Sequence, residues 1–234
     1  MKRLSILIIL ICSVTLSFAV ERKSIYDVVV DDLITDTQIT PDNVNDDHFA
    51  LVWWIPNEFW EAVLSQDASV PNEDTEAMLD VLSGVSLLAI VQADISPFGA
   101  FDFYSKDEVE QNLISFFTNG INQQQRLSLM KEINPDLEII INMLKPVLES
   151  AMGNFGNNLH FYVLDDLSRS KQRILDPYKE GLVEIKLLQR DGNLMTAKLE
   201  MPLNSLYIPR KCPNGMDAHI SWNYCPWTGV KLSE

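Results

Sequence analysis

The sequence predicts an α+β fold in which helices cover one face of a mostly antiparallel sheet, followed by a small ribbon-like module at the C-terminus. Two observations predict it. About six runs of β-branched and aromatic residues, typical of strands, are interspersed with segments whose apolar residues recur at helical spacing. These elements come in mixed order rather than in regular alternation, which favours antiparallel pairing with the helices packed on one side.

The N-terminus has the composition of a secretory signal peptide. Lys2 and Arg3 supply a positive start, Leu4–Phe18 is almost wholly apolar, and Ser17 and Ala19 place small residues where a signal peptidase cleaves. The apolar run is shorter than the about 20 residues that a transmembrane helix needs. We therefore predict cleavage after Ala19 and a periplasmic or secreted bacterial protein with no stable membrane insertion. An uncleaved membrane anchor is the alternative.

The chain is strongly acidic, with 18 basic and 33 acidic residues and a formal charge of −15. Loss of Lys2 and Arg3 with the signal peptide lowers the charge to −17. Nucleic acids and anionic membranes recruit proteins through clustered Lys and Arg, so neither is expected as a partner. Aspartates crowd residues 20–47, but this segment lacks the glycine and the regular ligand spacing of a calcium loop. We interpret it as a solvated acidic lead-in.

The first strand and helix are expected directly after this lead-in. Phe49–Pro56 is a β-branched and aromatic run that ends at a proline, which predicts a buried strand. Asn57 can cap the segment that follows, whose apolar residues fall on one helical face. Large aromatic residues dominate protein cores, so we expect Trp53 and Trp54 to be buried. An exposed platform that stacks against sugars is the alternative.

The remaining elements are predicted from the same two patterns. Ser105 and Glu108 form a capping box that begins a helix expected to end at Asn119, and Ile121–Glu132 is expected to be helical in part. The turn around Gly192 predicts a hairpin. The further predicted helices are Thr75–Leu82 and Pro135–Met152, and the further strands are Ser86–Ile95, Ala100–Tyr104, Leu159–Leu164, Leu182–Leu188 and Leu194–Met201.

The sequence contains no nucleophile elbow, H-E-x-x-H motif, phosphate loop or dinucleotide-binding glycine motif. His160, with Asp165 and Asp166 at the end of the same predicted strand, is the candidate for a general base. A lone strand histidine is more often a packed, hydrogen-bonded core residue, and we prefer that interpretation. Asp94 and Asp102 could flank a substrate, as paired carboxylates do in glycoside hydrolysis.

Two short turns stand out in the C-terminal tail, Cys212–Gly215 and Cys225–Gly229. They resemble the knuckles of a zinc ribbon, in which two C-P-x-C-G turns present four thiolates to one tetrahedral zinc ion. The resemblance covers only the tail. Each turn lacks its second cysteine, Thr228 standing there in the second turn, so the zinc ion is not carried over. The resemblance implies two tight turns joined by a hairpin, with Trp222 and Tyr224 covering it.

The ribbon resemblance brings these two turns side by side. Cys212 and Cys225 are the only cysteines left after signal removal, and the chain is bound for an oxidising compartment. We therefore predict a disulfide between them. A metal site formed by Cys212, Cys225 and His219 is one alternative, and a pair of free thiols is another.

These observations divide the chain into a signal peptide (1–19), the acidic lead-in (20–47), an α+β core (48–206) and a ribbon-like module (207–234). The whole chain resembles exported bacterial proteins of unassigned function that end in such a cysteine-poor ribbon. We predict a non-catalytic envelope protein that binds a protein or a small ligand and needs no cofactor. A hydrolase working through carboxylates or His160 is one alternative, and a metal-binding protein acting through the tail is the other.

Overall fold

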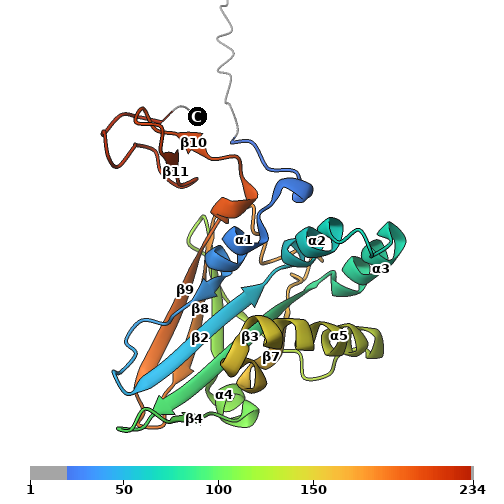
Figure 1. Ribbon diagram of the computed structural model, residues 1–234, viewed down its shortest axis with the longest axis vertical. Coiled ribbons are helices and arrows are strands. Elements are labelled where there is room, and N and C mark those ends of the chain that lie inside the picture. The colour runs from blue at the N-terminus through green and yellow to red at the C-terminus, as the bar shows by residue number, and fades with distance from the viewer. Residues whose placement is uncertain (1–19, 233–234) are drawn as a thin grey trace, which may run out of the picture.

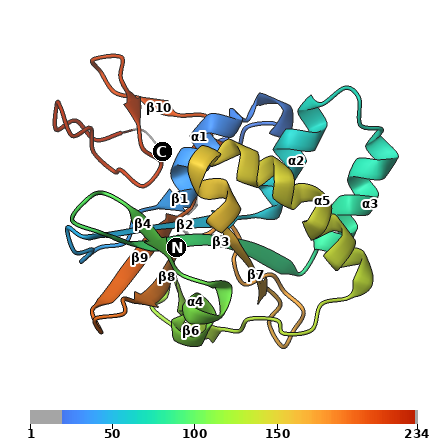
Figure 2. The same cartoon turned by 60° about the horizontal axis from the view of Figure 1, so that its bottom comes forward.

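The computed structural model describes residues 20–232 of the chain, and the predicted signal peptide, Met1–Ala19, lies outside them. Two antiparallel sheets pack face to face, and helices cover the outer face of the first sheet (Figures 1 and 2). The predicted α+β class, with a mostly antiparallel sheet and helices on one face, is confirmed.

The first sheet is built around β3, which pairs with β2 along one edge and with β7 and β4 along the other. All of these pairings are antiparallel. The strands of this sheet are β1 (Gln38–Ile39), β2 (His48–Ile55), β3 (Val85–Ile95), β4 (Phe101–Phe103) and β7 (His160–Asp165).

The second sheet has the order β6-β5-β8-β9 and is also antiparallel. Isolated bridges link the chain around the two sheets: Asp42, between β1 and β2, bridges to Thr196 of β9, and Leu129, just after β6, bridges to Leu164 of β7. A separate hairpin lies in the tail. The strands are β5 (Ile114–Asn119), β6 (Gln124–Leu127), β8 (Gly181–Leu188) and β9 (Leu194–Met201), with β10 (Arg210–Lys211) and β11 (Asp217–Ala218) in the hairpin.

The helices α1, α2, α3 and α5 lie over the first sheet, whereas α4 lies near β4 (Figures 1 and 2). The α-helices are α1 (Val30–Thr37), α2 (Asn57–Gln66), α3 (Asn72–Leu82), α4 (Lys106–Asn112) and α5 (Pro135–Ala151); the short 3₁₀ helices are η1 (Ile25–Asp27), η2 (Gly153–Asn158) and η3 (Asn204–Leu206). Within residues 20–232, we find no helix that combines the length and the apolar character needed to cross a membrane.

The predicted capping box at the start of α4 is present, since Ser105 Oγ accepts the Glu108 N–H and the Glu108 carboxylate accepts the Ser105 N–H. The prediction that this helix continues to Asn119 is wrong. α4 ends at Asn112 and the chain continues as β5, and the polar segment after it contains β6 rather than a helix. Phe117 faces the core at a strand position, because pairing with both β6 and β8 outweighs the helical spacing of the apolar residues.

The aromatic cluster at the end of β2 is buried, as predicted. Trp53 and Trp54 are each 1% exposed. The Trp53 ring meets Phe59 edge-on at 5.5 Å, and its indole N–H donates to Thr37 Oγ1 over 3.2 Å. Side chains alternate across a strand, so Trp53 packs toward the helices and Trp54 toward the second sheet.

The acidic lead-in takes part in this packing. Leu33 of α1 is fully buried, and Thr37 at the end of the same helix is buried as well. Asp31 and Asp32, one turn earlier, are exposed. Within this lead-in, α1 is therefore an amphipathic helix whose apolar face covers the sheet, and only its polar face is solvated as expected.

Replacement of Trp54 by alanine should lower the free energy of unfolding by about 3–5 kcal/mol, the usual cost of removing a fully buried aromatic side chain. Urea denaturation followed by circular dichroism measures this change. Trp227→Ala is the control, because Trp227 is 48% exposed and its loss should change stability by less than about 1 kcal/mol. Equal effects of the two substitutions would contradict the assigned packing.

Candidate functional site

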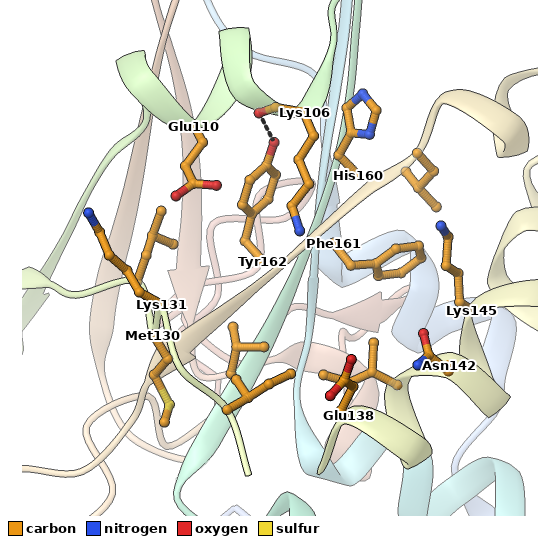
Figure 3. A pocket seen from close by; sticks show the side chains of 15 residues that line it. Lys106, Glu110, Met130, Lys131, Glu138, Asn142, Lys145, His160, Phe161 and Tyr162 are labelled. Atoms are coloured by element: carbon orange, nitrogen blue, oxygen red, sulfur yellow. Dashed lines mark hydrogen bonds between the residues drawn. The ribbon is translucent and has the colours of Figure 1, made fainter. Parts of the chain in front are cut away.

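A cleft of about 400 Å³ lies beside the outer edge of β7, and we call it the lysine cleft. Its walls are α5, the first turns of α4, residues 129–133 and β7 itself (Figure 3). Met130 donates its backbone N–H to Val163 O over 2.8 Å, after which the chain leaves the sheet. Asn134 then caps α5 by accepting the Leu137 N–H over 2.7 Å. The turn from strand to helix leaves the cleft open between these walls.

Three lysines from three separate elements line this cleft: Lys106 of α4, Lys131 of the connecting segment and Lys145 of α5 (Figure 3). Glu110 and Glu138 line it as well. The lining therefore carries more positive than negative side chains, although the chain has a formal charge of −15. Like charges focused in one concave surface raise the local concentration of counter-ions of opposite sign.

The floor of the cleft is aromatic. Phe161 and Tyr162 are mostly buried, and the Lys106 ammonium lies 5.7 Å from the centre of the Tyr162 ring. The Tyr162 hydroxyl donates to Lys106 O over 3.0 Å. Burial, followed by the nearby charges of Glu110 and Asp107, raises the pKa of the Tyr162 hydroxyl. This side chain therefore stays neutral and serves as a hydrogen-bond donor.

His160, the candidate general base, also lines the cleft. Its Nε2 lies 2.8 Å from Tyr104 O, to which it donates a hydrogen bond. Asp165 lies at the other end of β7, is exposed, and accepts the Leu167 N–H over 3.2 Å. His160 and Asp165 therefore do not form the His–Asp pair that a general base would need.

Asp166 is fully buried and is committed to a structural network. It accepts hydrogen bonds from Ser86 Oγ (2.8 Å), the Leu175 N–H (2.6 Å) and Arg173 Nε (3.2 Å). The Arg173 guanidinium also forms a bidentate pair with Glu58, at 2.6 and 2.9 Å. Through Arg173, this network joins Glu58 of α2 to the loop after β7. The Asp166 oxygens are already satisfied by these hydrogen bonds and cannot bind a substrate.

Asp94 and Asp102 do lie side by side, as register partners on β3 and β4. Both accept hydrogen bonds from Arg190 Nη1, at 2.9 and 2.8 Å, and the guanidinium stacks 4.1 Å above the centre of the Tyr104 ring. The Arg190 guanidinium therefore lies between the two carboxylates, where a substrate would have to bind. Glu108 completes this Arg190 cluster at 3.1 Å from Arg190 Nε.

The same cluster contains a His–Asp pair that sequence reasoning missed. His48 Nδ1 lies 2.8 Å from Asp94 Oδ1, and Tyr104 donates its hydroxyl to the same oxygen over 3.1 Å. Only the register of β2 on β3 brings His48 and Asp94 together, so no local sequence signal could have found them. His48 Nε2 is buried without a hydrogen-bond partner, so this histidine does not reach a ligand.

These contacts lower the pKa values of two carboxyl groups in the Arg190 cluster. Burial raises the pKa of Asp94, but hydrogen bonds from His48, Tyr104 and Arg190 outweigh it, and the pKa is lowered. Hydrogen bonds from the Ser105 backbone and from Arg190 lower the pKa of Glu108 from its ordinary 4.5 to about 2. Both carboxylates are therefore ionised throughout the neutral range, and the cluster ties two hairpins to the start of α4.

The tail contains two tight turns, but its hairpin encloses the first of them and does not join the two as the ribbon resemblance implied. β10 and β11 pair as a hairpin, and Gly215 and Gly229 turn the chain with φ angles of 83° and 68°. Cys212, Cys225 and two apolar residues form a small buried cluster of their own, against which Trp222 packs. Tyr224 is 59% exposed, so the expectation that it covers the hairpin together with Trp222 is wrong.

Cys212 and Cys225 are both buried thiols that interact directly. Burial raises the pKa of Cys225, but hydrogen bonds from the Cys212 thiol, the Thr228 hydroxyl and nearby backbone N–H groups lower it to about 7. Burial and the interaction with Cys225 raise the pKa of Cys212 to about 11. The pair is placed for oxidation, and the disulfide between them stays a prediction.

The alternative metal site is not assembled in the tail. His219 Nδ1 is bonded to Ser221 Oγ at 2.8 Å, and its ring packs against Trp222. Across residues 20–232, no group of three or more His, Cys, Asp or Glu side chains is arranged to hold a metal ion. Cys212, Cys225 and His219 thus do not form the ligand group proposed as the alternative.

No protein-family model matches the chain, and comparisons with the curated proteins and with the solved structures found no significant match. The lysine cleft is therefore the candidate site on the strength of its own geometry. Sequence reasoning found His160 but missed the three lysines, because Lys106 and Lys145 are brought together only by the tertiary fold.

Replacement of Arg190 by glutamine should destabilise the protein more at pH 6 than at pH 3. The lowered pKa values of Glu108 and Asp94 mean that the unfolded chain binds protons more readily than the folded one. The stability contributed by this cluster is therefore complete above about pH 4.5 and is lost as the pH falls toward about 2.

Urea denaturation of both proteins at the two pH values measures this difference. Arg169→Gln is the matched control, because Arg169 is exposed and lies outside the cluster. If Arg190→Gln lowers the urea midpoint equally at pH 6 and pH 3, the Arg190 cluster does not stabilise the fold through ionised carboxylates.

The disulfide prediction is tested with protein recovered from an oxidising environment. We expect no titratable thiol after denaturation, and Cys225→Ser should lower the free energy of unfolding by about 2–4 kcal/mol. A reducing agent should destabilise the wild-type protein by a similar amount and leave the Cys225→Ser variant unchanged. Two titratable thiols in the wild-type protein would exclude the disulfide.

Proposed function

We propose that the protein is an exported, non-catalytic binding protein that holds an anionic ligand in the lysine cleft. The observation that carries this proposal is the convergence of Lys106, Lys131 and Lys145 from three elements of an acidic chain. Glu110 and Glu138 in the lining, and Glu149 at 3.4 Å from the Lys145 ammonium, offset part of this positive charge, and a ligand bearing several carboxylates or phosphates would pair with the rest.

The size and lining of the cleft also support ligand binding there. About 400 Å³ lies within the range of clefts that bind small ligands or a short stretch of chain. The half-buried side chains of Leu129, Met130 and Ile133 offer apolar contact area, and the neutral Tyr162 ring lies beside the Lys106 ammonium. A polar rim around an apolar floor is the usual arrangement in binding sites.

Neither alternative function gains support from a comparable arrangement. A hydrolase needs an oriented base, and the only histidine of the cleft, among the described residues, donates Nε2–H to a backbone carbonyl with no carboxylate beside it. A metal-binding function would need a cluster of ligands, which residues 20–232 do not assemble. The binding role is therefore the better account of the cleft.

The test uses a fluorescently labelled hexaglutamate peptide as the anionic probe. Reversal of two cleft charges in the double variant Lys131→Glu, Lys145→Glu should weaken binding at least about tenfold, because attraction is replaced by repulsion. Added salt should weaken binding to the wild-type protein, as it does for exposed charge pairs. Fluorescence anisotropy measures both effects.

The double variant Lys171→Glu, Lys198→Glu is the matched control, since it makes the same change in net charge at exposed positions outside the cleft. It should bind the probe nearly as well as the wild-type protein. If both double variants lose binding equally, the probe responds only to net charge and the lysine cleft is not the site.

A further inference from the structure

One edge of β7 is unpaired where it borders the lysine cleft. β7 pairs with β3 along its whole length on one side. On its other side, the segment of residues 128–130 covers only the last residues of the strand, through the Leu129–Leu164 bridge. Within the described chain, no strand continues that pairing along residues 160–162.

The backbone groups of Phe161 point toward this open side. Val163 O accepts from the Met130 N–H at 2.8 Å, and the Asp165 N–H donates to Ser128 O at 2.9 Å. Both residues thus direct their backbone groups away from β3. Backbone directions alternate along a strand, so Phe161, two residues before Val163, presents its N–H and C=O in the same direction. They face the cleft, which Phe161 itself lines.

An unpaired strand edge is a template for a further strand, and the charges around it select which strand can bind. A second copy of this chain that paired through the same edge would bring its own Lys106, Lys131 and Lys145 against these lysines. Repulsion between like charges disfavours that pairing. An extended segment with acidic side chains would instead be attracted by these lysines.

The lysines are also placed on both faces of the strand that would be added. Side chains of an extended peptide alternate between the two faces of a sheet. Phe161 and the α5 residue Lys145 lie on one side of β7, and Tyr162 with the α4 residue Lys106 lies on the other (Figure 3). Acidic side chains at either set of alternate positions therefore meet a lysine.

We propose that this edge of β7 is a strand-addition site for an extended acidic peptide segment. The peptide backbone pairs with the N–H and C=O of Phe161, and its carboxylates lie beside the lysines on the two faces. This inference rests on the proposed function, the binding of an anion in the lysine cleft, and specifies the chemical class of that ligand.

The test compares three peptides with identical side chains, each seven residues long and alternating glutamate with valine. The first has an ordinary backbone, and the other two are N-methylated at one or the other set of alternate nitrogens. In a paired strand only one set of N–H groups faces the neighbouring strand. We expect one methylated peptide to bind at least about tenfold more weakly than the ordinary peptide, and the other to bind within about threefold of it.

The second measurement is hydrogen exchange at the Phe161 backbone amide. Binding of the ordinary peptide should slow this exchange at least about tenfold, because the N–H becomes paired. The double variant Lys131→Glu, Lys145→Glu should bind none of the three peptides detectably under the same conditions.

The outcomes separate the two proposals. If all three peptides bind the wild-type protein equally and Phe161 exchange is unchanged, strand addition is wrong and the anionic cleft stands. If neither hexaglutamate nor any of these peptides binds the wild-type protein, the proposed function fails and this inference fails with it.

Discussion

The burial of β3 on both faces and both edges is the constraint on which the rest of the molecule depends. Its backbone is paired with β2 on one side and with β7 and β4 on the other, so its polar groups are satisfied while its side chains are excluded from water. Helices cover one face and the second sheet covers the other. Trp53 and Trp54, adjacent on β2, fill these two layers and are each 1% exposed. A change in the register of β2 by one residue would exchange the two tryptophans between layers of different shape.

This arrangement explains why β7 ends as an edge and why the cleft forms there. β3 is longer than β7, and β4 takes the remaining part of the same edge. The chain that covers the far side of β7 must turn into α5 at Asn134, so it leaves residues 160–162 unpaired. The cleft is thus a consequence of topology, and the side chains of Lys106, Lys131 and Lys145 give it a charge.

Patterns of neighbouring residues were enough to predict most strands and helices. The aromatic run of β2 and the Ser105 capping box were read correctly, because each depends on residues close in sequence. The prediction of a helix for Ile114–Asn119 is wrong, because its apolar residues have helical spacing and only pairing with β8 makes the segment a strand. The lysine cleft and the His48–Asp94 pair were beyond prediction, since both arise from residues that the tertiary fold alone brings together.

The lysine cleft and the tail that holds Cys212 and Cys225 lie in different parts of the molecule. The tail lies beside α1, at the end of the molecule away from α4 and β7 (Figure 1). Cys212 and Cys225 belong to a buried cluster of their own rather than to the main core. The predicted disulfide would therefore stabilise a small module with its own packing, whereas the proposed ligand binding would depend on charges at the edge of the main sheet. Because the tail lies away from the lysine cleft, coupling between them would have to pass through the β3 sheet, whose buried pairing on both edges opposes a rearrangement.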